Sequence, residues 1–184
     1  MNNPQSLIAD VARRYLHVRE TSKNQSFDIS KFWDATWYPT GDDNREPWCV
    51  ASCVYWIQQA DKQSIDIQLR VPPRMASVSE FEKWATDPKN GCLTFTWERA
   101  NSVYIPQRGE IVTFHFKTGN HIGVVDSTPF SKPTTGETYI KTIEGNTSSG
   151  NIGSQRDGDG VFERERSRTI CGLFVRLPTR AKIA

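Results

Sequence analysis

The sequence of 184 residues predicts a single α+β domain, in which helices come first along the chain and an antiparallel sheet follows. Apolar residues recur at helical spacing up to about residue 86, whereas from about residue 110 they alternate with a period of two. The chain has the length of one domain, and it contains no internal repeat and no long linker. Helices that precede the strands, rather than alternating with them, are typical of the α+β class.

Three helices are expected in the first half of the chain. Apolar residues lie on one face over residues 3–16, and Pro4 stands in the first turn, where a missing N–H costs nothing. A second helix over residues 47–60 has so wide an apolar face that it must be buried, and a third is expected over residues 77–86. Candidate caps are Asp42, Asp43, Asn44 and Glu46 for the second helix, and Ser77 or Ser79 for the third.

Five strands are expected in the second half. Val112, Phe114 and Phe116 share one face of a strand over residues 110–116, which a turn joins to a returning strand. The other strands are expected at 121–126, 139–144, 161–166 and 169–177, with loops at 129–136 and 145–160. The segment from 19 to 48 carries aromatic anchors but few regular signals.

Composition and charge exclude several classes of function. The 23 Lys and Arg against 21 Asp and Glu disfavour nucleic-acid binding through bulk charge. No run of apolar residues is long enough for a membrane span, and the N-terminus lacks the regions of a secretory signal. A function outside the cytoplasm would then need another route of delivery.

The cysteine and histidine content gives no support for a zinc site. The four cysteines form no C-x-x-C pair, and there are only three histidines. We expect Cys49, Cys53, Cys92 and Cys171 to be thiols, most of them packed as small apolar residues and one of them reactive.

Cys49 is the candidate nucleophile, because it stands in the first turn of the predicted buried helix. The helix dipole and the unpaired N–H groups of that turn favour a thiolate, and the same N–H groups can bind an oxyanion. The alternative is that Cys49 is a small core residue, as most cysteines are.

A thiol nucleophile needs a base, and only His17, His115 and His121 are available. His17 ends an amphipathic helix and is expected at the surface. His121 opens a strand, where its ring can project toward a helix end, and Gly123 on the same face leaves space for it. We therefore predict His121 as the base, with His115, on the face opposite Val112 and its neighbours, as the fallback.

The base in turn needs a polar group to orient it. Glu144 and Asn146 end a predicted strand two residues apart, so on an extended chain they point to one side. Either could hold the imidazole while the other adds polarity to the site. The alternative is that both are ordinary residues of a turn.

This order, a Cys on a helix followed by a His and an acceptor on successive strands, is that of papain-like cysteine hydrolases. The segments PWCVASCVYW, GEIVTFHFKTGNHIGVV, IEGNTSSG and RDGDGVFERER resemble the CHAP-domain family of peptidoglycan hydrolases, over roughly residues 7–175. The resemblance implies a papain-like CHAP or NlpC/P60 fold with helices packed on a partly barrel-like sheet. It also implies Cys49 as nucleophile, His121 as base, and Glu144 with Asn146 as orienting groups. Asn120 departs from the pattern, since many relatives carry Gly before the histidine.

No cofactor and no metal are expected. Some relatives bind calcium through carboxylates that flank the cysteine, but Ala51 stands where those members place an acid. The alternating carboxylates Asp157 and Asp159 lack the distal Glu of a calcium loop, so a turn is predicted there. The arginines at 13–14 and at 164, 166 and 168 are predicted to be solvated, and the tryptophans to be core or half-buried anchors.

The resemblance implies hydrolysis of a peptidoglycan amide, either the N-acetylmuramoyl-L-alanine bond or a bond of the stem or cross-bridge. The first hypothesis for its biological setting is a monomeric phage endolysin that acts on peptidoglycan and has no nucleic-acid or membrane partner. The second hypothesis is a secreted antibacterial amidase effector with an immunity partner. Two further alternatives are a cysteine protease or deamidase of protein substrates, and an inactive module that binds the wall through its tryptophans.

Overall fold

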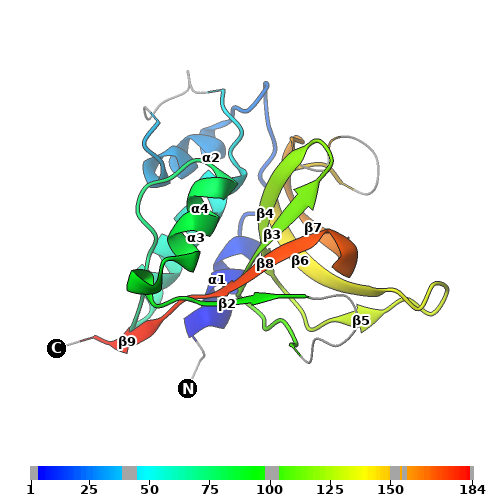
Figure 1. The fold of residues 1–184 in the computed structure, drawn as a ribbon. Helices are drawn as coiled ribbons and strands as arrows, with labels where there is room; N and C mark the ends of the chain where they lie inside the picture. The colour runs from blue at the N-terminus through cyan, green and yellow to red at the C-terminus, as the bar shows by residue number, and fades with distance from the viewer. Residues whose placement is uncertain (1–3, 39–44, 98–103, 150–153, 155–156, 183–184) are drawn as a thin grey trace.

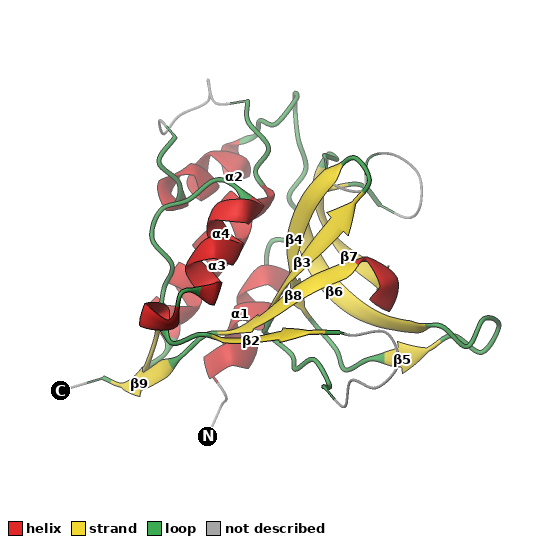
Figure 2. Ribbon diagram, in the orientation of Figure 1, coloured by secondary structure: helices red, strands yellow, loops and turns green. Residues whose placement is uncertain are grey.

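The computed structural model describes the chain except for residues 1–3, 39–44, 98–103, 150–153, 155–156 and 183–184. A layer of helices lies beside a curled antiparallel sheet (Figures 1 and 2), which confirms the predicted α+β class. The helices are α1 (Pro4–Arg13), α2 (Phe27–Ser30), α3 (Cys49–Gln63) and α4 (Val78–Thr86), with 3-10 turns η1 (Lys31–Ala35), η2 (Pro88–Asn90) and η3 (Arg168–Ile170). None of the helices in the described part of the chain is both long and apolar enough to span a bilayer.

The main sheet has the strand order β2-β8-β3-β4-β6-β5. Strand β7 also pairs with β6, along the edge opposite β4 and β5. Its strands are β2 (Leu93–Thr96), β3 (Ile111–Phe116), β4 (Gly119–Val125), β5 (Phe130–Ser131), β6 (Thr138–Thr147), β7 (Gly160–Ser167) and β8 (Cys171–Arg176). A second small sheet joins β1 (Ile67–Leu69) to β9 (Thr179–Ala181), and the pairings in both sheets are antiparallel. The predicted hairpin is confirmed, since β3 pairs with β4 and sets Phe114 opposite His121.

Two hydrophobic clusters occupy the two faces of the main sheet. The larger one lies under α1 and α3, and includes Ile57 of α3 and Ile122 of β4. The smaller one contains Val112 and Phe114, with Phe116 packed against it, as the period-two pattern predicts. Trp33, Trp48, Trp56 and Trp97 are buried and Trp84 is half-buried, which confirms the predicted anchor role for most tryptophans; Trp37 is exposed.

The predicted helices are present, with shifted ends. α1 ends at Arg13, and the next residues continue as turns in which Arg14 N–H reaches the Val11 carbonyl at 3.0 Å. α4 has Ser77 as its N-cap in a reciprocal capping box with Glu80, so Ser77 rather than Ser79 is the cap. At α3 the N-cap position is held by Trp48, which supplies no side-chain capping bond. Of the four candidate caps, Asp42, Asp43 and Asn44 lie outside the described residues, and Glu46 is not the N-cap.

The largest difference from the predicted strands is at β6. The strand was expected to end at Glu144, but it continues to Thr147 through a register shift, with Asn146 in the left-handed region at φ 58°. Gly and Asn after a strand usually mark a loop, and here they form a β-bulge instead. Four strands of two to four residues (β1, β2, β5 and β9) and the short helical turns α2 and η1 are too short to leave a periodic signal.

Candidate active site

Cys49 is the first residue of α3 and is buried, with 6% of the residue exposed. The preceding residue fixes its position. Trp48 is fully buried, packs against Phe32 with ring centroids 5.6 Å apart, and donates from Nε1 to Glu20 Oε1 at 2.9 Å. Trp48, at the N-cap position, supplies no side-chain capping bond, and the first N–H groups of a helix have no partner within the helix itself.

His121 lies beside Cys49, on β4, and is completely buried. Its ring stacks on Phe114 with centroids 6.1 Å apart, and its Nε2 lies 3.1 Å from Oε2 of Glu144 on β6. Since Nε2 faces the carboxylate, Nδ1 is the nitrogen left to exchange a proton with the sulfur. The sequence prediction of Cys49, His121 and Glu144 therefore describes three side chains that the fold brings together.

The electrostatic setting favours a protonated imidazole. Burial lowers the pKa of His121, but hydrogen bonding and charge from Cys49 and Glu144 outweigh burial and raise it to about 9. An imidazolium held next to a cysteine stabilises the thiolate, which is the nucleophilic form of the residue.

Glu144 owes its charge to a residue that the sequence analysis missed. Arg166 donates from Nε to Glu144 Oε1 at 2.8 Å and from Nη2 to Oε2, and Thr142 donates to Oε1 at 2.5 Å. Burial raises the pKa of Glu144, but Arg166 and His121 outweigh it and lower the pKa to about 2. The carboxylate therefore stays ionised and keeps its place between the guanidinium and the imidazole.

The prediction that Arg164 and Arg166 are solvated was wrong, since they are only 6% and 4% exposed. On β7 the exposed residues are the alternating Glu163 and Glu165, so the two arginines point to the opposite, buried side. The sequence contains a pattern that indicates this burial. Arginines that alternate with acidic residues along a strand place the positive charges on one face and the negative charges on the other.

Two glycines let the elements of the site approach one another. We expected Gly123 to make room for the His121 ring. A Cβ on Gly123 would instead lie 2.6 Å from Cγ of Glu144, so this glycine makes room for Glu144. A Cβ on Gly145 would lie 2.3 Å from Oγ of Ser52 and 2.7 Å from the Trp48 ring. The absence of a side chain at 145 therefore lets β6 lie directly on the first turns of α3.

Asn146 is also buried, but Glu144 is the acceptor that faces the imidazole. The structure thus separates the two candidates that the sequence left open. The side-chain amide of Asn146 is buried with no hydrogen-bond partner among the described residues. A buried unpaired amide can serve a bound ligand, because its donor and acceptor are costly to leave unused.

The fallback base, His115, lies on the other face of the hairpin. Its Nε2 is 2.9 Å from Oε1 of Glu82 on α4, and its side chain is 54% exposed. Thr113, on the same face, donates to the same carboxylate. His17 is at the surface as predicted, with its side chain 65% exposed. Neither histidine joins the group formed by Cys49 and Glu144.

All four cysteines are free thiols, as expected. In the described residues, no group of three or more His, Cys, Asp or Glu side chains is placed to hold a metal ion. The segment with Asp157 and Asp159 forms two bends in the connection between the paired strands β6 and β7, and Gly158 N–H donates to the Asn146 carbonyl of β6 at 3.0 Å.

Comparison with known proteins gives no relative: no family model, no curated protein and no solved structure matches the chain.

Proposed function

We propose that the protein is a papain-like cysteine hydrolase that cleaves an amide bond of peptidoglycan. The observation that carries the proposal is the buried series Arg166–Glu144–His121 that ends beside Cys49 at the start of α3. The choice of peptidoglycan as substrate is supported by the motifs around Cys49, His121 and Glu144.

In the proposed mechanism, the Cys49 thiolate attacks the carbonyl carbon of the amide. The carbonyl oxygen becomes an oxyanion, which the Cys49 N–H at the helix start and the unpaired amide of Asn146 stabilise. His121 then donates its proton from Nδ1 to the leaving amine, so the C–N bond breaks and a thioester remains. Neutral His121 takes a proton from water, whose oxygen attacks the thioester and regenerates the thiolate.

Glu144 keeps the imidazole in one orientation through both steps, and Arg166 keeps Glu144 ionised. This division of roles needs no cofactor. It also explains why a buried site tolerates so many charged groups, since each has an opposite charge as its neighbour.

The test is digestion of purified peptidoglycan by wild type, Cys49→Ala and the matched control Cys92→Ala. Cys92 is half-buried outside the site, and burial raises the pKa of its thiol to about 11. We expect wild type and Cys92→Ala to release fragments equally, and Cys49→Ala to lose activity by about a thousandfold or more. Clearing by Cys49→Ala at the wild-type rate would eliminate the thiol mechanism.

Mass spectrometry of the fragments assigns the bond. Free stem peptides identify an amidase, and shortened stems identify an endopeptidase. Cleavage of protein substrates with intact peptidoglycan would replace the proposal by that of a protease. His121→Ala should be as inactive as Cys49→Ala, whereas His115→Ala should remain active; the reverse result would overturn the choice of base.

A further inference from the structure

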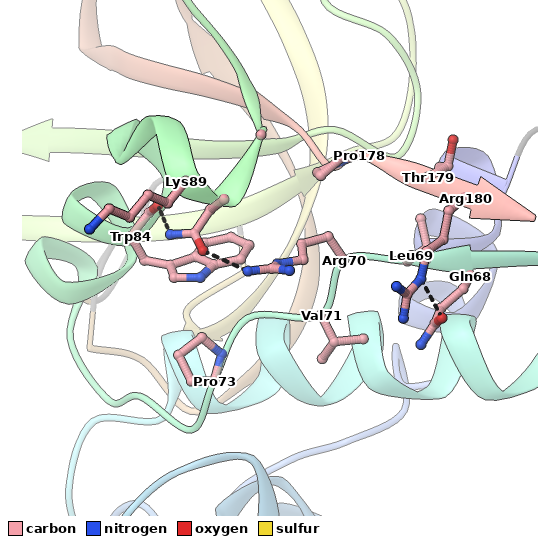
Figure 3. A pocket seen from close by; sticks show the side chains of 12 residues that line it. Gln68, Leu69, Arg70, Val71, Pro73, Trp84, Lys89, Pro178, Thr179 and Arg180 are labelled. Atoms are coloured by element: carbon pink, nitrogen blue, oxygen red, sulfur yellow. Dashed lines mark hydrogen bonds between the residues drawn. The ribbon is translucent and has the colours of Figure 1, made fainter.

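A second candidate site lies away from Cys49, in a groove of about 680 Å³ between the β1 and β9 strands and the end of α4 with η2 (Figure 3). Its volume is in the range of small-molecule sites, which hold ligands of roughly 300–1,000 Å³. Neither the proposed nucleophile nor its base lines this groove. The proposed hydrolysis therefore leaves it without a role.

The charge of the groove is one-sided. Arg70, Lys89 and Arg180 line it, and its described lining contains no carboxylate. All three side chains belong to exposed residues. A concave surface that presents only positive charge attracts anions.

The two arginines are held in place by neutral groups. Arg70 donates from Nη2 to Asn90 Oδ1 at 3.0 Å, and Asn90 is itself fixed by a bond from Nδ2 to the Trp84 carbonyl at 2.8 Å. Arg180 donates from Nε to Gln68 Oε1 at 2.8 Å. An amide oxygen orients a guanidinium without cancelling its charge, so the remaining N–H donors stay charged and directed for a carboxylate or phosphate.

The walls between these charges are apolar and rigid. Trp84 is half-buried in one wall, and Pro73 and Pro178 form other parts of the lining. In Figure 3 the Arg70 side chain points toward Trp84, while Arg180 lies toward the opposite end beside Gln68. A flat indole next to a cation suits a ring with an apolar face and an acidic substituent, whereas a short acidic peptide offers no such ring.

We propose that this groove binds an acidic glycan. A sugar ring packs against Trp84, and carboxylate or phosphate groups along the glycan pair with Arg70 and Arg180, with Lys89 adding attraction at the rim. The binding needs no chemistry at Cys49, so it can be tested independently of the proposed hydrolysis.

The experiment measures binding to the Cys49→Ala protein by calorimetry and by NMR of the tryptophan indole groups. The probes are tetragalacturonate, which carries carboxylates, a phosphorylated mannan oligosaccharide, neutral cellotetraose and tetraglutamate. We expect one or both acidic glycans to bind and to shift the Trp84 indole signal, and comparison of the two distinguishes carboxylate from phosphate recognition. Neutral cellotetraose should bind at least tenfold more weakly.

The variant Arg70→Ala/Arg180→Ala should weaken acidic-glycan binding at least tenfold. Its control is Lys117→Ala/Lys141→Ala, which removes the same charge from exposed positions on the β3–β4 turn and on β6. Circular dichroism and melting confirm that both variants are folded. Equal loss in the control, no binding of either acidic glycan, or equally tight binding of tetraglutamate would overturn the proposal.

Discussion

At the scale of single residues, the site is an alternation of buried charges. Arg166 neutralises Glu144, and Glu144 faces His121, which faces Cys49. Glu144 and His121 are completely buried, so bulk water does not solvate these two groups. Each charge therefore depends on its neighbour, since an unpaired ion in a protein interior costs several kcal/mol.

Replacing Arg166 should expose this dependence. We expect Arg166→Met to destabilise the fold by about 3 kcal/mol, because Glu144 then loses its main counter-charge. The double variant Arg166→Met/Glu144→Gln should recover much of that loss, since it leaves no unpaired carboxylate. Urea unfolding of wild type, Arg166→Met, Glu144→Gln and the double variant measures the coupling in a double-mutant cycle.

The matched control for that cycle is an ion pair that includes Glu165, the residue before Arg166 on β7. Lys132 and Glu165 form an ion pair at 2.9 Å, and both side chains are partly exposed to solvent. Lys132→Met should change stability little, because water screens the pair. If Arg166→Met were as mild as Lys132→Met, the buried charge of Glu144 would not depend on Arg166.

At the scale of elements, the site is made where β6 crosses the start of α3. Gly145 brings the two backbones together, and the bulge at Asn146 follows at once. The helix start supplies the sulfur, while β4 and β6 supply the groups that act on it. The spacing of these elements therefore matters as much as the identity of the reacting residues.

Substituting Gly145 should disturb the spacing directly. A methyl group in Gly145→Ala would overlap Ser52 and the Trp48 ring, so α3 must move or β6 must bend. We expect a loss of about 1–3 kcal/mol in stability from overpacking. A shift of about 1 Å in Cys49 can cost about a hundredfold in rate, so activity should fall even though the protein remains folded. Thermal melting and the peptidoglycan assay measure the two effects.

Gly136→Ala is the control for that substitution. Gly136 has φ 67°, but a Cβ there meets nothing within 4 Å. Its replacement should cost about 1–2 kcal/mol of backbone strain and leave activity unchanged. Wild-type activity in Gly145→Ala would show that the close approach of β6 and α3 does not position the nucleophile.

The elements differ in how far the sequence predicted them. α3 and the β3–β4 hairpin have periodic apolar patterns, so both were predicted with small errors at their ends. The continuation of β6 was missed, because Gly145 and Asn146 have the composition of a loop and only the packing against α3 shows their role. Arg166 was missed for a related reason, because a charged residue on a strand is expected to face solvent until its partner on another strand is known.

At the scale of the whole molecule, the fold joins residues that are far apart in the chain. Cys49 and His121 were predicted as a pair from chemical need, and a sequence of one chain contains no direct information on their distance. The groove around Arg70 and Arg180 was not predicted at all, since its lining comes from three separate parts of the chain. Local patterns predict elements, whereas sites of this kind exist only after the elements pack.

The charged site should also change how the free energy of unfolding depends on pH. The pKa of His121 is raised to about 9 in the folded protein, against about 6.5 for an ordinary histidine of an unfolded chain. A group that binds its proton more tightly when folded stabilises the fold fully below the lower value, and this contribution is lost as pH rises through the upper one. The stabilising contribution of His121 should therefore be present at pH 6 and gone by about pH 9.5.

Comparison with His121→Gln isolates this contribution, because most other titrating groups are common to both proteins. We expect the free energy of unfolding of wild type, relative to the variant, to fall by a few kcal/mol between pH 6 and about pH 9.5. Urea denaturation at half-unit pH steps measures the difference. Parallel curves for the two proteins over this range would mean that folding does not raise the pKa of His121, which would then be neutral above about pH 7.5. The proposed thiolate would then lack the cation that stabilises it.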